Sequence, residues 1–220
     1  MARSYHQNCP IALGLDVLGE RWTLLILREL IGGARRYGDL RAELPGIASN
    51  LLADRLRELE EEGLVDRTEL PPPIARTVYT LSEVGWRKVP PVVQAIATFG
   101  LDMVEFGESA LTPLNGFLAG ILLAFDPDRA GELTASYAVD IDGRRFEFGV
   151  HPGGLAAPQG PPAVSATATA ADLITARLGS TAAERKAALR RVRFDGEAGA
   201  VDAMRTVFGL SGDPGLLVGK

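Results

Sequence analysis

Polar and basic side chains gather in the first half of one predicted helix, at residues 49–62. When a helix docks into the major groove of DNA, its N-terminal residues meet base edges, where Asn pairs with adenine, Arg with guanine and Asp with cytosine. The candidates for such contacts are Ser49, Asn50, Asp54 and Arg57. The helix ends in three consecutive glutamates, 60–62, which oppose the helix dipole and would point away from a nucleic acid. The pattern therefore favours base recognition by the N-terminal end of this helix.

A structural interpretation of the same residues remains open. Ser49 is then only the N-cap of the helix, and Asp54 pairs with Arg57 on a solvated face. Arg55 lies between inward-facing leucines, so it is either a DNA contact or one half of a structural salt bridge.

Three further arginines are candidates for phosphate contacts, which position a protein on DNA without reading its sequence. Arg35 and Arg36 precede the predicted helix at 37–44, and Arg76 lies beside a predicted two-stranded ribbon. The alternative is that they only keep the surface soluble.

Few residues are suited to catalysis or metal binding. Cys9 is the only cysteine, and the two histidines, His6 and His151, have no partner at the spacing of a metal site or of a nucleophile and its base. The sequence also lacks a glycine-rich phosphate loop. We therefore expect no catalytic residues, no metal, no cofactor and no enzyme activity.

Length and composition indicate a folded cytoplasmic protein. The chain has 220 residues, room for two ordinary domains, with 46% hydrophobic and 23% charged residues. Its net charge is −5, so any nucleic-acid surface must be local. The N-terminus has no apolar targeting region, and the longest apolar stretch, near 116–125, is too short to span a membrane. We expect no membrane partner.

Hydrophobic periodicity places the polar helix in a helical first domain, 1–108. Helices are predicted at 11–18, 21–31, 37–44 and 49–62, with Gly63 as the C-terminal cap of the last, and strands at 64–70 and 76–81 around three prolines, 71–73. A helix from Ser82 is expected to break at Pro90 and Pro91 and to resume with Val93, Ile96, Gly100 and Met103 at helix-pairing spacing. We expect this seam and the helix at 11–18 to form a homodimer.

The motifs of this half resemble the HxlR-type bacterial transcriptional regulators. They are Cys9-Pro10, Arg21-Trp22-Thr23, residues 26–30 and 36–40, Leu44-Pro45-Gly46-Ile47, residues 55–60, Gly63-Leu64-Val65 and Tyr79-Thr80-Leu81. The wing departs from the family, since Arg76-Thr77-Val78-Tyr79 stands where an acidic residue more often precedes the tyrosine. The resemblance implies a winged helix-turn-helix that binds double-stranded DNA.

Cys9 lies at the start of a helix, where the positive end of the helix dipole favours the thiolate. Some members of the HxlR type use a cysteine at this motif as an oxidation sensor, so the resemblance makes Cys9 a candidate redox residue. The interpretation we prefer is that Cys9 is a small buried apolar residue.

The second half, 109–220, is predicted to be a separate α+β domain. Its first expected elements are a helix from Thr112-Pro113 to Phe125, a hairpin of strands 133–140 and 144–150 turning at Asp142-Gly143, and a loop at 151–162. A strand at 163–169 and two helices, at 171–178 and from the capping box at Thr181, are expected next. The last elements are a strand at 192–194 and a helix carrying Val201, Met204 and Phe208. This order resembles the sterol carrier protein type two fold.

That resemblance implies an apolar tunnel between sheet and helices. Its candidate lining residues are Phe117, Ile121, Phe125, Phe146, Phe148 and Met204. The alternative, which we favour for any one of them, is a filled core.

Together these patterns predict a homodimeric DNA-binding regulator with an α+β domain that binds an apolar small-molecule effector. One alternative is a lipid-carrier or enzyme-like protein in which the winged helix only mediates assembly. The other is a regulator whose second domain is purely structural.

Overall fold

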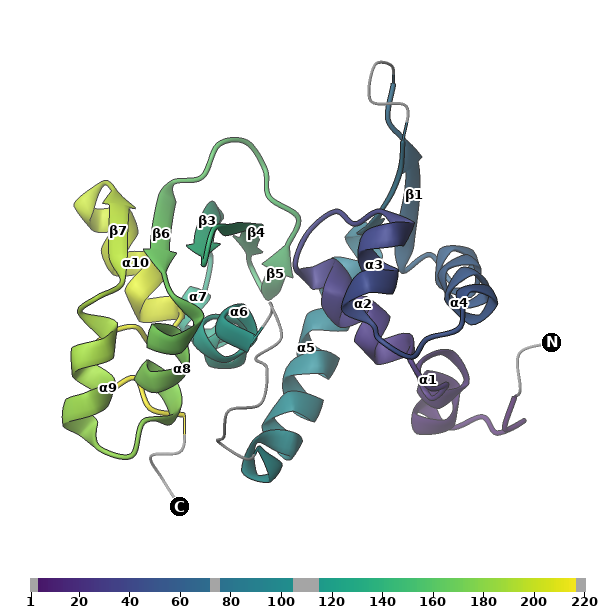
Figure 1. Cartoon of the computed structure of the whole chain (residues 1–220), viewed down its shortest axis with the longest axis horizontal. Helices are drawn as coiled ribbons and strands as arrows, with labels where there is room; N and C mark the ends of the chain where they lie inside the picture. Colours follow the sequence, from purple (N-terminus) through teal and green to yellow (C-terminus); the bar gives the residue numbers. More distant parts are fainter. Residues whose placement is uncertain (1–3, 72–75, 105–114, 217–220) are drawn as a thin grey trace. The chain divides into compact units, whose positions relative to one another are not determined.

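The computed structural model describes residues 4–71, 76–104 and 115–216 (Figure 1). The chain divides into two compact units, Met1–Val89 and Pro90–Lys220. The domain boundary predicted at 108/109 lies outside the described residues, as do Thr112 and Pro113, the expected start of a helix.

Helices and a two-stranded ribbon make up the first unit. Its elements are α1 (Pro10–Leu18), α2 (Thr23–Ile31), α3 (Tyr37–Glu43), α4 (Ser49–Glu61), β1 (Val65–Glu69), β2 (Thr77–Leu81) and the beginning of α5 (Glu83–Gly100). The leucine stripe of α4, Leu52, Leu56 and Leu59, is buried, as the helical spacing predicts. This is the winged helix-turn-helix expected from the sequence.

Gly63 ends α4 as predicted. Its φ of 68° is in the left-handed region that glycine adopts without strain. The following N–H, of Leu64, donates to the carbonyl of Leu59, and the N–H of Gly63 donates to that of Glu60. This is the hydrogen-bond pattern of a Schellman cap, and it turns the chain directly into β1.

The ribbon pairs β1 and β2 antiparallel, with Val65 opposite Leu81. A short bridge extends it, because the N–H of Arg35 donates to the carbonyl of Tyr79 at 2.9 Å and the N–H of Tyr79 donates back at 2.7 Å. The turn before α3 is thereby attached to the ribbon.

The predicted break at Pro90 and Pro91 is wrong, because α5 continues through both prolines. A proline removes a helical hydrogen-bond donor. Here Trp86, Val89 and Val93 form a buried stripe on both sides of the prolines, and burial of that stripe stabilises the helix.

A five-stranded sheet with flanking helices makes up the second unit. After the end of α5 and the 3₁₀ turn η1 (Leu101–Met103) come α6 (Asn115–Gly120), η2 (Leu122–Ala124), α7 (Pro127–Ala130), β3 (Ala135–Ile141), β4 (Arg144–His151), β5 (Gly154–Ala156), β6 (Val164–Ala168), α8 (Ala170–Leu178), α9 (Ala182–Leu189), β7 (Arg193–Gly196) and α10 (Ala198–Val207). This agrees with the predicted α+β class.

The sheet order is β5-β4-β3-β6-β7, and only the β3–β6 pair is parallel among the described strands. The predicted hairpin is confirmed, with Asp142 and Gly143 at φ values of 50° and 80° in its turn. Strand β5 lies within the segment predicted to be a loop, because three residues are too few to show an alternating pattern.

The helix predicted up to Phe125 ends earlier, at Gly120. The carbonyl of Gly120 accepts hydrogen bonds from Nη2 and Nε of Arg177 at 2.7 and 3.2 Å. A Cβ at Gly120 would lie 2.8 Å from Leu173, so only glycine allows this approach of α6 to α8. These tertiary contacts end the helix despite its apolar stripe.

Arg177 is the largest fully buried side chain of the described residues. Besides Gly120, it donates to the carbonyls of Phe208, Gly209 and Pro214 at 2.6 to 2.9 Å. Burial lowers the pKa of its guanidinium to about 10. One side chain thus joins α6 to the end of α10 and to the segment that follows it.

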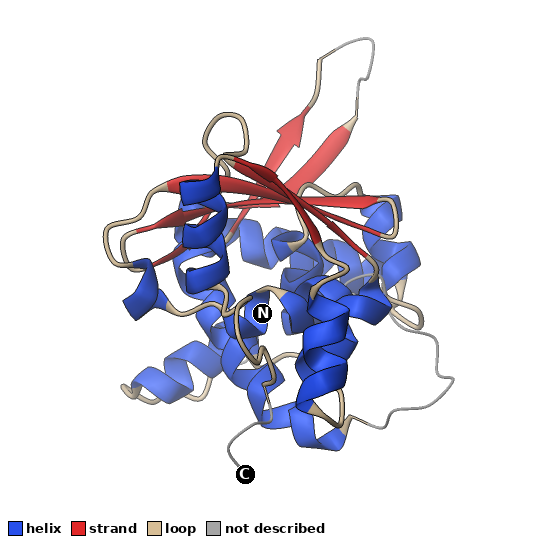
Figure 2. Cartoon of the chain, turned by 90° about the vertical axis from the view of Figure 1, so that its left-hand side faces the viewer, coloured by secondary structure: helices blue, strands red, loops and turns tan. Residues whose placement is uncertain are grey.

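Aromatic side chains pack against one another between sheet and helices. The rings of Phe117 and Phe146 stack 4.6 Å apart, and Phe148 lies 5.6 Å from Phe117. Ile121, Phe125 and Met204 are buried as well. Figure 2 shows the helices of this unit, nearest the viewer, beneath its sheet.

Candidate nucleic-acid interface

The N-terminal end of α4 presents its side chains to solvent. Ala48 is the N-cap and Ser49 the first helical residue, so the interpretation of Ser49 as the N-cap is wrong. Ser49 and Asn50 are exposed, and the Ser49 carbonyl accepts a 2.5 Å hydrogen bond from the Tyr37 hydroxyl. This bond holds the start of α4 against α3 and leaves both side chains free to meet a ligand.

Asp54 and Arg57 form an ion pair on the same helix. Nη2 of Arg57 lies 3.0 Å from Oδ1 of Asp54, and its Nε lies 3.8 Å from Glu61. The structure therefore contains the Asp54–Arg57 pair that the structural interpretation predicts. Both side chains remain about half exposed, and an exposed pair of this kind holds its partners weakly.

Arg55 lies on the inner side of α4. Its side chain is only 16% exposed, and it donates to Glu20 at 3.0 Å and to Glu58. This geometry matches the salt-bridge interpretation of Arg55. Helix α4 is thereby joined to the turn between α1 and α2.

The three candidate phosphate contacts differ in accessibility. Arg36 and Arg76 are exposed. Arg35 is half-buried, and burial lowers the pKa of its guanidinium although Glu29 and Glu43 lie near enough to oppose the shift. Of these three, only Arg36 and Arg76 present freely accessible charge.

Two acidic partners were not predicted from the sequence, Glu58 as the partner of Arg55 and Glu29 as the partner of Arg28. Glu58 is three positions from Arg55, a spacing that indicates a helical ion pair. Glu29 lies in an apolar run, where no pattern marks it; it is 1% exposed and 2.8 Å from Arg28, and burial raises the pKa of its carboxyl.

Cys9 is half-buried, so its expected burial is not observed in the single chain. It is the N-cap residue of α1, and the nearby backbone N–H groups of Ala12 and Ile11 lower the pKa of its thiol. A lowered thiol pKa is also what the position of Cys9 at the start of a helix predicts.

Two helices present large apolar side chains to solvent. On α1 these are Ile11, at 73% exposure, with Leu13 and Leu15; on α5 and the turn after it they are Ile96, Phe99, at 76% exposure, Met103 and Val104. Val93, expected in the same seam, is instead buried. The sequence spacing missed Phe99, which lies beside the predicted stripe.

In the described ranges, no three His, Cys, Asp or Glu side chains are grouped so that they could hold a metal ion. No helix among these residues has the length and apolar character needed to cross a membrane.

Comparison with known proteins identifies the first half of the chain. The model of the HxlR-like helix-turn-helix family matches residues 17–107. The HTH-type transcriptional regulator sll1512 of Synechocystis is 40% identical over 108 residues, which cover 49% of this chain and 79% of that protein. The chain belongs to the HxlR-like helix-turn-helix family.

Other members resemble this HxlR-like protein to a similar extent. The HTH-type transcriptional regulator YvaP of Bacillus subtilis is 32% identical over 45% of this chain and 92% of its own length. The solved structure of reduced YodB, a transcriptional regulator of B. subtilis, is 32% identical and covers 46% of this chain and all of its own, with a TM-score of 0.40. The family model ends at residue 107, before the five-stranded sheet.

Proposed function

We propose that this HxlR-like protein is a homodimeric, cytoplasmic transcriptional regulator that reads double-stranded DNA with the N-terminal half of α4. The observation that carries the proposal is the split of α4 into two ends. Ser49 and Asn50 are exposed in its first turn, Arg57 is exposed past its middle, and glutamates crowd its end. A helix that enters the major groove needs this polarity, because DNA repels the acidic end.

Arg36 and Arg76 are proposed to contact phosphates on either side of the groove. Both are exposed, one at the start of α3 and one beside the ribbon. Arg35, with its backbone paired to Tyr79, would position the ribbon, and Arg55 would hold α4 through its ion pairs. Asp54 would meet a base only after releasing Arg57.

Dimerisation is proposed through the exposed apolar side chains of α1 and α5. Large apolar groups that remain in water cost free energy that a second copy would recover by covering them. A two-fold dimer would also present two copies of α4 to successive turns of DNA.

The second unit is proposed to have the sterol-carrier-like architecture and to bind an apolar effector. The order of elements on which the resemblance is based is present in the structure. An effector among the six candidate residues would have to separate the stacked rings of Phe117 and Phe146. Their packing supports the alternative, a purely structural domain, equally well.

Selection of bound fragments from a genomic DNA library by the full chain tests the central proposal. The selected fragments should share a sequence, and Asn50→Ala should lose most of the preference for it. Glu60→Ala, an exposed change at the other end of α4, should retain that preference. If the chain binds all fragments alike, α4 does not read sequence.

A panel of fatty acyl and sterol-like compounds tests the effector. A ligand of the second unit should raise the unfolding temperature and shift the affinity for the selected DNA, because only unequal binding to two states changes their equilibrium. If no compound raises the unfolding temperature, the second unit is structural.

A further inference from the structure

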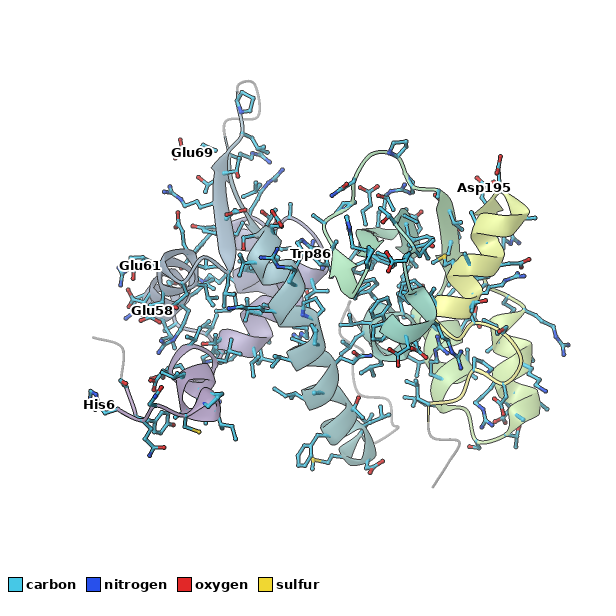
Figure 3. All side chains as sticks on the ribbon, turned by 180° about the vertical axis from the view of Figure 1, so that it is seen from behind. His6, Glu58, Glu61, Glu69, Trp86 and Asp195 are labelled. Atoms are coloured by element: carbon cyan, nitrogen blue, oxygen red, sulfur yellow. The ribbon has the colours of Figure 1, made fainter. Side chains whose placement is uncertain are left out.

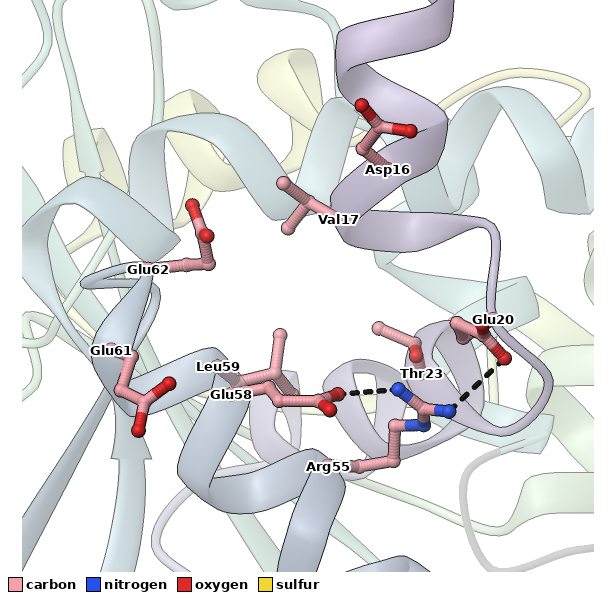
Figure 4. Close-up of a pocket in the computed structure, with 9 residues that line it drawn as sticks. All are labelled: Asp16, Val17, Glu20, Thr23, Arg55, Glu58, Leu59, Glu61 and Glu62. Atoms are coloured by element: carbon pink, nitrogen blue, oxygen red, sulfur yellow. Dashed lines mark hydrogen bonds and ion pairs between the residues drawn. The ribbon is translucent and has the colours of Figure 1, made fainter. Parts of the chain in front are cut away.

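A cavity between α1 and the C-terminal half of α4 is lined mainly by acidic side chains (Figure 4). Its carboxylates are Asp16, Glu20, Glu58, Glu61 and Glu62, and its one basic side chain is that of Arg55. All of them belong to the first unit. The wall therefore has five carboxylates and one guanidinium.

Ion pairs compensate only part of this negative charge: Glu61 pairs at 3.8 Å with Arg57, which does not line the cavity. Arg55 binds Glu20 and Glu58 at once. Asp16 accepts hydrogen bonds from the hydroxyl of Ser4 and the N–H of Tyr5, both of which are neutral. The cavity is thus strongly electronegative, and it would attract a cation.

Thr23 provides independent evidence for a ligand. It lines the cavity from the start of α2, its residue surface is 1% exposed, and its Oγ1 has no hydrogen-bond partner among the described residues. Figure 4 shows its side chain at the edge of the space, beside the guanidinium of Arg55. Buried hydroxyls are normally hydrogen-bonded, so this one needs a partner.

Apolar side chains complete the wall. Val17 and the buried Leu59 face the same space. The carboxylates are not grouped closely enough, three or more together, to hold a metal ion within the described ranges. The wall therefore suits an organic cation, which has aliphatic groups as well as charge.

We propose that this cavity binds a small organic cation, an ammonium or guanidinium group on a short aliphatic chain. The cationic N–H groups would donate to Thr23 Oγ1 and to Asp16 and Glu62, for which the described residues supply no arginine partner. The methylene groups would contact Val17 and Leu59. The ligand would touch both α1 and α4, so its binding would bear on the helix proposed to read DNA.

Calorimetric titration of the full chain with 1,4-diaminobutane tests the proposal. The expected result is saturable binding of one diamine per chain, and no binding of the uncharged 1,4-butanediol. Thr23→Val keeps the shape of the side chain and removes the hydroxyl, so the diamine affinity should fall about tenfold. Without diamine this variant should be at least as stable as the original chain, because it no longer buries an unpaired hydroxyl.

Two glutamine variants distinguish diamine binding in the cavity from general attraction of the diamine to a negatively charged protein. Glu62→Gln, in the cavity, should weaken diamine binding about tenfold. Glu69→Gln makes the same change of charge on β1, well apart from Glu58 and Glu61 (Figure 3), and should leave the affinity unchanged. If Thr23→Val fails to fold, Thr23→Ser should bind as the original chain does, and Glu62→Gln still tests the site.

Three outcomes would overturn the proposal: no saturable binding, equal losses in the two glutamine variants, or unchanged binding by a folded Thr23→Val chain. In the last case a water molecule satisfies the hydroxyl. The titration contains no DNA, so its result does not depend on whether α4 reads sequence.

Discussion

Arg55 and Glu20, 35 positions apart in the chain, form a 3.0 Å ion pair between Nη2 and Oε2. The pair fixes the inner side of α4 to the turn that precedes α2, and the second ion pair of Arg55, with Glu58, lies within α4 itself. The outer side of α4 carries Arg57, whose partners are exposed. Two arginines of one helix thus have different environments, and this difference can be measured.

Arg55→Ala should lower the free energy of unfolding by about 1 kcal/mol, since its partners are partly exposed and water can solvate them after the change. Arg57→Ala should change it by less than about 0.5 kcal/mol, as for most surface substitutions. Urea unfolding of both variants checks the contrast. Equal losses would mean that the ion pairs of Arg55 do not stabilise the first unit.

Arg57→Ala should weaken binding to the selected DNA by about 1 to 3 kcal/mol and relax the sequence preference. Arg36→Ala should weaken all DNA alike and reduce the salt dependence by about one unit of slope. Fluorescence anisotropy on specific and random duplexes at several salt concentrations separates the two effects. If both variants behave alike, the division between base reading and phosphate contact is wrong.

Phe99→Ser should shift the solution mass toward the monomer, because this apolar side chain is 76% exposed in the single chain and has no structural need to be aromatic there. Light scattering at micromolar concentration measures the shift. Lys88→Ser, an exposed change on the same helix, is the matched control and should leave the mass unchanged. A monomeric original chain would refute the homodimer.

Stability should fall as the pH drops from about 4 to about 2, and Asp213 should contribute to the loss. Two hydrogen bonds of 2.7 Å from Arg185 lower the pKa of this carboxyl from 3.8 to about 2. The folded chain therefore binds fewer protons than the unfolded chain in this range, and the stabilisation present above pH 4 is lost as the pH falls through about 2. Asp213→Asn should flatten this part of the stability curve, which thermal unfolding at a series of pH values would show.

Cys9 should react with a maleimide in the folded protein. It is half-buried, and the backbone N–H groups of Ala12 and Ile11 lower the pKa of its thiol, so more thiolate is present than in a free cysteine at the same pH. The labelling rate at neutral pH, with and without denaturant, measures this. Labelling that begins only after denaturation would show that Cys9 is covered in solution and would exclude a sensing role.

The sequence by itself predicted most of the local structure. Periodic leucines marked α4, glycine marked its end at Gly63, and Asp142-Gly143 marked the hairpin turn. Each of these signals depends on neighbours within a few positions, where backbone preference and side-chain spacing decide the outcome. The family motifs, too, were visible without coordinates.

The tertiary structure decided where polar groups found their partners. Pattern alone left Arg55 between two interpretations, because Glu20 is too distant in the chain for any spacing rule to connect them. Likewise, α6 ends at Gly120 because Arg177, from α8, binds its carbonyl, and the acidic cavity around Thr23 forms only where α1, α2 and α4 meet. Contacts of this kind depend on burial and on distance in space, and a linear sequence records neither.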